Sequence, residues 1–157
     1  MSREQDVPTT PRGDAVVRRR LRGAGLRVTR PRVLVYAALR EAGGHRTVDE
    51  IVAWLAARGH ALPRMSVYNV AADLTTAALV MRADAGPGAA VYEAADAWHH
   101  HFVCRVCGAI EDVPCLTGRK PCLLPAPPFG GTVDEAQVIF RGVCARCARA
   151  RRPKTLH

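Results

Sequence analysis

The first half of this chain repeats hydrophobic side chains every three or four positions, a spacing that predicts short amphipathic helices. Glycine or polar turns interrupt the pattern, so we expect four helices, at 15–23, at 30–42, from Thr47 to Gly59 and at 66–78. Thr29 and Thr47 are the expected N-caps of the second and third helices. Pro31 favours the first turn of the second helix, and Glu50 completes a capping box with Thr47.

Two short β-prone runs, 79–84 and 89–94, follow the fourth helix, and a turn rich in glycine and proline separates them. Four helices followed by a hairpin outline a winged helix-turn-helix, whose last helix enters the major groove of DNA. A small helical bundle that never touches DNA would give the same pattern. Both interpretations therefore stay open on periodicity alone.

The second half predicts strands at 102–106, 109–113 and 138–143, with a proline-rich loop before the last of them. We expect an α+β fold divided into four parts. These are a disordered lead-in at 1–13, a winged-helix DNA-binding domain at 14–94, a dimerisation and zinc-binding domain at 95–148, and a basic tail at 149–157. No apolar run approaches the roughly 20 residues of a membrane helix, so no membrane partner is expected.

Two Cys-x-x-Cys pairs stand out in the second half, Cys104 with Cys107 and Cys144 with Cys147. Four thiolates complete the tetrahedral sulfur shell that structural zinc favours. The 36 residues between the pairs predict a structured insert, with a helix and strands, that brings them together. Two disulfides or a redox pair are the alternatives, but the N-terminus has no apolar signal segment and a redox site needs only one pair.

The net charge of +9 favours a polyanionic partner, and residues 14–85 alone contribute +6. Polar side chains gather at the start of the fourth predicted helix, where base edges and phosphates are contacted. The candidates there are Arg64, Ser66, Tyr68 and Asn69, with Arg82 on the predicted wing. A merely solubilising surface is the alternative.

A winged helix joined to a His/Cys block at 99–107 resembles the ferric uptake regulator family. The stretch Leu26-Arg27-Val28-Thr29-Arg30-Pro31-Arg32, the sequence Ser66-Val67-Tyr68-Asn69, the pair Tyr92-Glu93, and His45 carry the resemblance with that block. It implies a cytoplasmic, homodimeric, metal-dependent repressor, not an enzyme, that binds double-stranded operator DNA. Arg27 and Arg30 then join the candidate DNA contacts.

The resemblance also assigns two metal sites. Cys104, Cys107, Cys144 and Cys147 match the structural zinc site, and the regulatory site falls on His45, Glu93, His99, His101 and Asp112. Imidazoles and carboxylates suit Fe(II) or Mn(II), and also Ni(II) or Zn(II). His99 and His101 would share one face of a strand, with His100 on the other. Because the ligands come from both halves, a bound ion would clamp the two domains. Each ligand taken alone also fits an ordinary surface or turn position.

The assignment of the chain to a branch of the family rests on two positions. Asp112 resembles the aspartate of the peroxide-sensing branch, in which iron chemistry oxidises a ligand histidine, here His45 or His99. Glu93 departs from that branch, whose members commonly have aspartate there. We therefore expect a peroxide-responsive repressor of oxidative-defence genes, with a plain iron, zinc or nickel sensor as the alternative.

Two departures concern other residues. The linking segments and the stretch 134–143 resemble the catalase-linked repressors of the family. Cys115 and Cys122 are not needed by the zinc site, and they are either ordinary buried thiols, a reversible disulfide or a second thiol-bearing sensor element. Ala78 stands where a helix-ending glycine is usual. A zinc deaminase would need a His-x-Glu motif before its cysteines, which the chain lacks. A zinc-ribbon interaction module would leave the basic first half unexplained.

Overall fold

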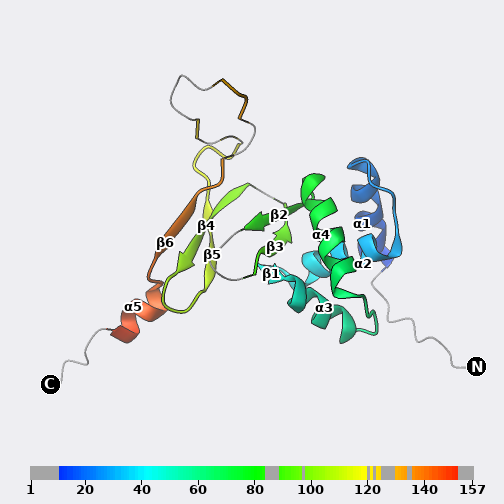
Figure 1. Cartoon of the computed structure of the whole chain (residues 1–157), viewed down its shortest axis with the longest axis horizontal. Coiled ribbons are helices and arrows are strands. Elements are labelled where there is room, and N and C mark those ends of the chain that lie inside the picture. The colour runs from blue at the N-terminus through cyan, green and yellow to red at the C-terminus, as the bar shows by residue number, and fades with distance from the viewer. Residues whose placement is uncertain are drawn as a thin grey trace, which may run out of the picture. The chain divides into compact units, whose positions relative to one another are not determined.

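The computed structural model describes residues 11–83, 89–96, 98–119, 121, 123–124, 130–133 and 136–151, with the side chains of 11, 12 and 151 excepted. The chain divides into two compact units, Met1–Asp96 and Ala97–His157. Helices dominate the first unit, and a small sheet forms most of the second (Figure 1). The α+β class and the winged helix-turn-helix are confirmed. No described helix is long and apolar enough to cross a membrane.

Four helices build the core of the first unit, in the order that the hydrophobic period predicts. They are α1 (Pro11–Gly23), α2 (Arg30–Ala42), α3 (Val48–Ala56) and α4 (Arg64–Thr76). Each contributes a fully buried leucine to one cluster, namely Leu21, Leu39, Leu55 and Leu74. α1 begins four residues before the predicted start, so residues 11–13 are helical and the expectation of disorder there was wrong. Residues 1–10 lie outside the description.

The two predicted N-caps differ. Thr47 forms the expected capping box, since its hydroxyl accepts from the Glu50 N–H at 3.2 Å and the Glu50 carboxylate accepts from the Thr47 N–H at 2.7 Å. Thr29 is the N-cap residue of α2, as predicted, but its side chain makes no capping hydrogen bond. Pro31 explains part of the difference, because it occupies the second helical position and has no N–H to donate.

A three-stranded sheet completes the first unit, in the order β1-β3-β2. Its strands are β1 (Arg46–Thr47), β3 (Val91–Ala94) and β2 (Val80–Ala83), and all pairs are antiparallel. β2 and β3 form the predicted wing, whose turn at 84–88 lies outside the described residues. The two-residue β1 was not predicted. It places the segment after His45 beside the central strand that carries Glu93.

The second unit is a sheet of order β5-β4-β6 followed by a short helix. The elements are β4 (His99–Cys104), β5 (Ile110–Pro114), β6 (Ile139–Gly142) and α5 (Ala145–Arg151). β5 is antiparallel to β4, and β6 is parallel to it. The expected helix between the cysteine pairs was wrong for the described part of 108–143, which contains only strands and turns. Residues 149–151 belong to α5 and not to a tail.

Candidate metal centres and nucleic-acid interface

The four cysteines of the two Cys-x-x-Cys pairs converge at one end of the second unit. Cys104 ends β4 and Cys107 lies in the following turn, while Cys144 precedes α5 and Cys147 lies in its first turn. Their sulfur atoms all lie within 4.8 Å of one another, and Cys107 Sγ is 3.8 Å from Cys144 Sγ. Sulfurs bound tetrahedrally at about 2.3 Å from zinc would be about 3.8 Å apart.

Backbone donors and a neighbouring arginine stabilise thiolate charge in this cluster. The Cys144 N–H donates to Cys104 Sγ at 3.3 Å, and this bond chiefly lowers the pKa of Cys104 to about 6. The Ala109 backbone N–H and then the Arg146 side chain lower the pKa of Cys107. A hydrogen bond to Cys107 raises the pKa of Cys147 to about 12. A divalent cation bound to the cluster would take the place of a thiol proton.

The disulfide alternative fails for these cysteines. All five described cysteines are free thiols, and a separation of 3.8 Å between sulfurs far exceeds a disulfide bond of about 2.05 Å. Cys115 is half-buried, and its sulfur lies 3.3 Å from the hydroxyl of Thr117. Its proposed redox partner, Cys122, lies outside the described residues.

His45 and Glu93 form a buried pair within the first unit. His45 lies between α2 and β1, in a bend that Gly43 and Gly44 allow by adopting φ of 60° each. Its Nε2 lies 3.5 Å from Oε1 of Glu93, on the central strand, and their side chains are only 10% and 7% exposed. A carboxylate so well screened from water requires a cation or hydrogen-bond donors to balance its charge.

A second donor group, in the second unit, consists of His99, His101 and Asp112. His101 pairs with Asp112 in the β4–β5 register, His99 Nε2 lies 3.5 Å from Asp112 Oδ1, and one ligand atom of each residue lies within 4.8 Å of the others. The rings of His99 and His101 have centroids 4.9 Å apart. Strand alternation thus brings both imidazoles together on one face, as predicted.

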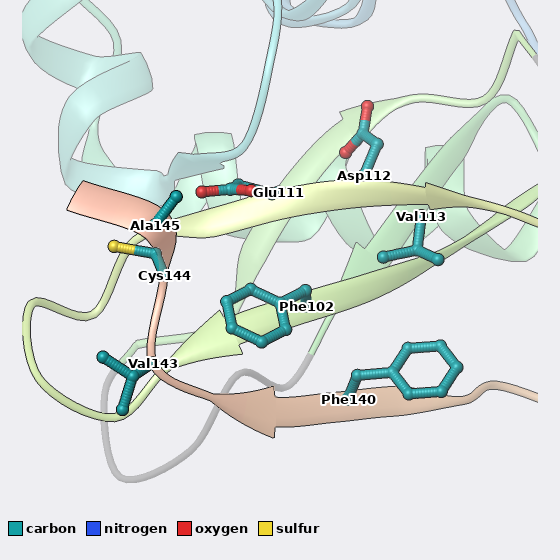
Figure 2. A pocket seen from close by; sticks show the side chains of 8 residues that line it. All are labelled: Phe102, Glu111, Asp112, Val113, Phe140, Val143, Cys144 and Ala145. Carbon is teal, nitrogen blue, oxygen red and sulfur yellow. The ribbon is translucent and has the colours of Figure 1, made fainter. Parts of the chain in front are cut away.

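His100 points to the opposite face, where it packs against aromatic rings. Its ring centroid lies 6.1 Å from that of Trp98 and 6.3 Å from that of Phe140, in edge-to-face geometry. This half-apolar face also carries a shallow groove of about 440 Å³ (Figure 2). The groove is lined by Phe102, Glu111, Asp112, Val113, Phe140, Val143, Cys144 and Ala145. Figure 2 shows the rings of Phe102 and Phe140 on neighbouring strands.

The predicted DNA contacts all lie in the first unit, on the segments expected to carry them. Arg27 precedes α2, Arg30 begins it, and Arg82 lies on β2; all three are exposed. The remaining four are in the first two turns of α4, where Tyr68, Asn69 and Arg64 are exposed and Ser66 is half-buried. Met65 beside them is 60% exposed.

Two side-chain pairings near the predicted DNA contacts were not predicted from the sequence. Arg32 donates to the carbonyl of Arg27 at 3.0 Å and to Oδ2 of Asp73 at 2.7 Å, so it ties the segment before α2 to α4. Asp49, on α3, accepts from Nε of Arg64 at 2.6 Å. Both pairings join elements that only the tertiary fold brings together, and periodicity does not report them.

Residues 23–115 match the model of the ferric uptake regulator family. The transcriptional regulator FurA of Mycobacterium tuberculosis is 43% identical over 132 residues, which are 82% of this chain and 87% of that protein. Ferric uptake regulation protein 1 of Mycolicibacterium fortuitum is 41% identical over 121 residues, 76% of this chain and 74% of that one. The manganese-containing structure of the ferric uptake regulator from Pseudomonas aeruginosa superposes with a TM-score of 0.65 at 25% identity, covering 83% and 98% of the two chains.

Proposed function

Because this chain belongs to the ferric uptake regulator family, we propose that it is a metal-responsive repressor that binds specific operator DNA as a homodimer in the cytoplasm. The proposal rests on one observation, namely that a chain with a basic winged helix also carries two chemically different sets of metal-ligating side chains. One group offers only sulfur, and the other side chains offer only imidazole nitrogen and carboxylate oxygen.

The sulfur cluster is the structural zinc site of this proposal. Its donors are soft, their number fills a tetrahedral shell, and the spacing of Cys107 Sγ and Cys144 Sγ matches that shell. With every position filled by protein, such a site leaves no coordination position for a substrate. The ion would instead join the β4–β5 turn to the start of α5 and hold the second unit together.

The regulatory ion, in this proposal, takes ligands from both units. His45 and Glu93 come from residues 14–94, which we assign to DNA binding, and His99, His101 and Asp112 come from residues 95–148, which we assign to dimerisation. Neither group alone offers enough donors for the five or six ligands that Fe(II) or Mn(II) commonly takes. An ion bound to both would favour one arrangement of the winged helices in the dimer, and that preference couples metal to operator affinity.

DNA recognition is assigned to α4 and its neighbours. Arg64, Ser66, Tyr68 and Asn69 would lie in the major groove, while Arg27, Arg30 and Arg82 would contact the backbone. The excess positive charge of this half favours the association with duplex DNA.

Iron is our first choice of signal, since the relatives at 43% and 41% identity are named FurA and ferric uptake regulation protein. The peroxide-sensing prediction is retained as a second candidate, on the aspartate at position 112. When bound, Fe(II) supplies reducing power toward hydrogen peroxide. His45 and His99 are the ligands on which the resulting oxidation would be found.

The test measures binding of the full-length protein to the tightest duplex selected from a random-sequence pool. Metal-free, Fe(II)-loaded and Mn(II)-loaded protein are compared without oxygen, beside His101→Ala and a control. The control is His60→Ala, because His60 follows α3 in the sequence and belongs to neither donor group. We expect either metal to raise affinity by about 5- to 150-fold in the wild type and in the control, and not in His101→Ala. The proposal would be refuted if the wild type selects no duplex from the pool, or if its affinity for the selected duplex does not change when metal is added.

Treatment with hydrogen peroxide distinguishes the iron sensor from the peroxide sensor. Both metal forms are treated with hydrogen peroxide, and the peptides that contain His45 and His99 are then weighed. Loss of DNA binding by the Fe(II) form alone, with one oxygen atom added to either peptide, would establish peroxide sensing. Binding that survives peroxide in the Fe(II) form would leave an iron sensor and exclude the second candidate.

A further inference from the structure

One exposed ion pair lies at the start of the helix assigned to DNA recognition. Arg64 is the first residue of α4, and its Nε donates to Oδ1 of Asp49, the second residue of α3, at 2.6 Å. The two side chains are 59% and 68% exposed. The guanidinium proposed to meet DNA is therefore already bound to a carboxylate of the same chain, in a place that duplex DNA can reach.

We propose that Asp49 competes with DNA for Arg64 and so lowers affinity, most strongly for the operator, where Arg64 must leave the carboxylate; this inference rests on the proposed function. α3 and α4 pack together in one unit (Figure 1), so the carboxylate stays beside the guanidinium while the side chains turn between partners. The structure thus assigns Asp49 as a residue that lowers DNA affinity through Arg64 and has no need to touch a base.

Whether DNA displaces Asp49 from Arg64 depends on how strong each contact to the guanidinium is. An exposed pair such as this one is worth up to about a fivefold change in equilibrium constant. A single phosphate contact from an exposed arginine is of similar size, so non-specific DNA does not reliably displace Asp49. A bidentate contact to a guanine edge is worth about 5- to 150-fold, which is enough to displace it. Only a duplex with the right base opposite Arg64 then engages this residue fully.

A second arginine–aspartate pair, between Arg32 on α2 and Asp73 on α4, has a different role. Arg32 contacts Asp73 at 2.7 Å and the carbonyl of Arg27 at 3.0 Å, and its side chain is only 22% exposed. Two partners and partial burial fix Arg32 in place, so it supports the backbone before α2. Asp73 is consequently not expected to control access to DNA, although it is also acidic and lies on α4.

The experiment compares Asp49→Asn with Glu41→Gln in the Mn(II)-loaded full-length protein. Glu41 is an exposed acid on α2, so its substitution changes net charge by the same amount. Affinity for the selected operator and for a scrambled duplex is measured over a series of salt concentrations. We expect Asp49→Asn to bind the operator up to about fivefold more tightly, because the contact between Asp49 and Arg64 no longer has to be broken. Affinity for the scrambled duplex should rise by less, with a salt slope steeper by at most about 0.9, as for one added phosphate contact.

A double-mutant cycle with Arg64→Gln isolates the pair. Once Arg64 is replaced, Asp49→Asn should act no more strongly than Glu41→Gln. Thermal unfolding of each variant shows whether loss of the acid from the first turn of α3 has disturbed the fold. Equal effects of Asp49→Asn and Glu41→Gln, an effect that persists beside Arg64→Gln, or a larger rise on the scrambled duplex than on the operator would each overturn the inference. Failure of the wild type to bind any selected duplex would instead refute the proposed function.

Discussion

The turn between α4 and β2 contains a backbone conformation that its residue does not favour. Ala78 has φ of +55°, and it is the one non-glycine residue with positive φ among the described residues. The turn is fixed by two hydrogen bonds, from the Ala78 N–H to the Thr75 carbonyl at 3.0 Å and from the Leu79 N–H to the Leu74 carbonyl at 2.9 Å. Such bonds usually accompany a glycine at this position. Replacing Ala78 with glycine should therefore stabilise the first unit.

The size of the effect follows from two opposing contributions. An L-residue in the left-handed region costs about 1–2 kcal/mol relative to its right-handed conformation, and glycine avoids this cost. Glycine in turn loses more backbone entropy on folding, by about 0.5–1 kcal/mol. The net gain for Ala78→Gly is about 0.5–1 kcal/mol. For a unit of this size, that is a rise of about 2–8 °C in Tm.

Unfolding of the first unit can be followed by fluorescence of Trp54. All variants are made in a Trp98→Phe protein, because this substitution removes the tryptophan fluorescence of the second unit. Ala72→Gly is the matched control, because Ala72 is an exposed residue in the interior of α4 and should lose about 1 kcal/mol. If Ala78→Gly destabilises the protein as Ala72→Gly does, the tertiary structure does not hold Ala78 in the left-handed region. The reasoning would then be refuted.

Three further predictions test the caps, the sheet and the zinc site. Thr47→Ala should cost about 1–2 kcal/mol in the free energy of unfolding, whereas Thr29→Ala should cost less than about 0.5 kcal/mol, as urea titration of both would show; equal losses would contradict the observed difference in capping. Gly142→Ala should lower the thermal stability of the second unit, since the added Cβ would lie 3.1 Å from an aromatic carbon on β4, and unchanged melting would show that the ring moves freely. Cys147→Ser should weaken zinc retention against a chelator by more than about 100-fold, while the control Cys115→Ser should retain zinc like the wild type. Equal zinc retention by Cys147→Ser and the wild type would exclude Cys147 as a ligand.

Local signals predicted most of the secondary structure because local physics decides it. The 3.6-residue period placed α2 at its observed bounds, and the Thr47/Glu50 capping box sets the start of α3 through bonds between neighbours in sequence. The convergence of the sulfur ligands was predictable for a related reason. Cys-x-x-Cys spacing itself brings two thiols together, and the second pair supplies the two further ligands that a tetrahedral zinc ion needs.

Contacts between distant segments were beyond the reach of sequence patterns. β1 is two residues long and exists only because β3 pairs with it. The Asp49–Arg64 pair joins side chains 15 positions apart, through the packing of α3 against α4. Thr29 shows the converse, since a favourable residue type at the right place makes no side-chain cap. In each case, the deciding information lies in partners that the local sequence does not contain.

The three consecutive histidines of β4 divide their roles by strand register. β5 places Asp112 beside His101 on one face, and β6 places Phe140 beside Phe102 on the other, where His100 packs. A shift of one residue would exchange the faces and put His100 beside the carboxylate. The cysteine cluster opposes such a shift, because the Cys104 N–H donates to the Ala109 carbonyl at 2.9 Å and Cys104 Sγ accepts from Cys144. A zinc ion bound there would therefore also determine which histidines face Asp112, although it lies at the other end of the strand.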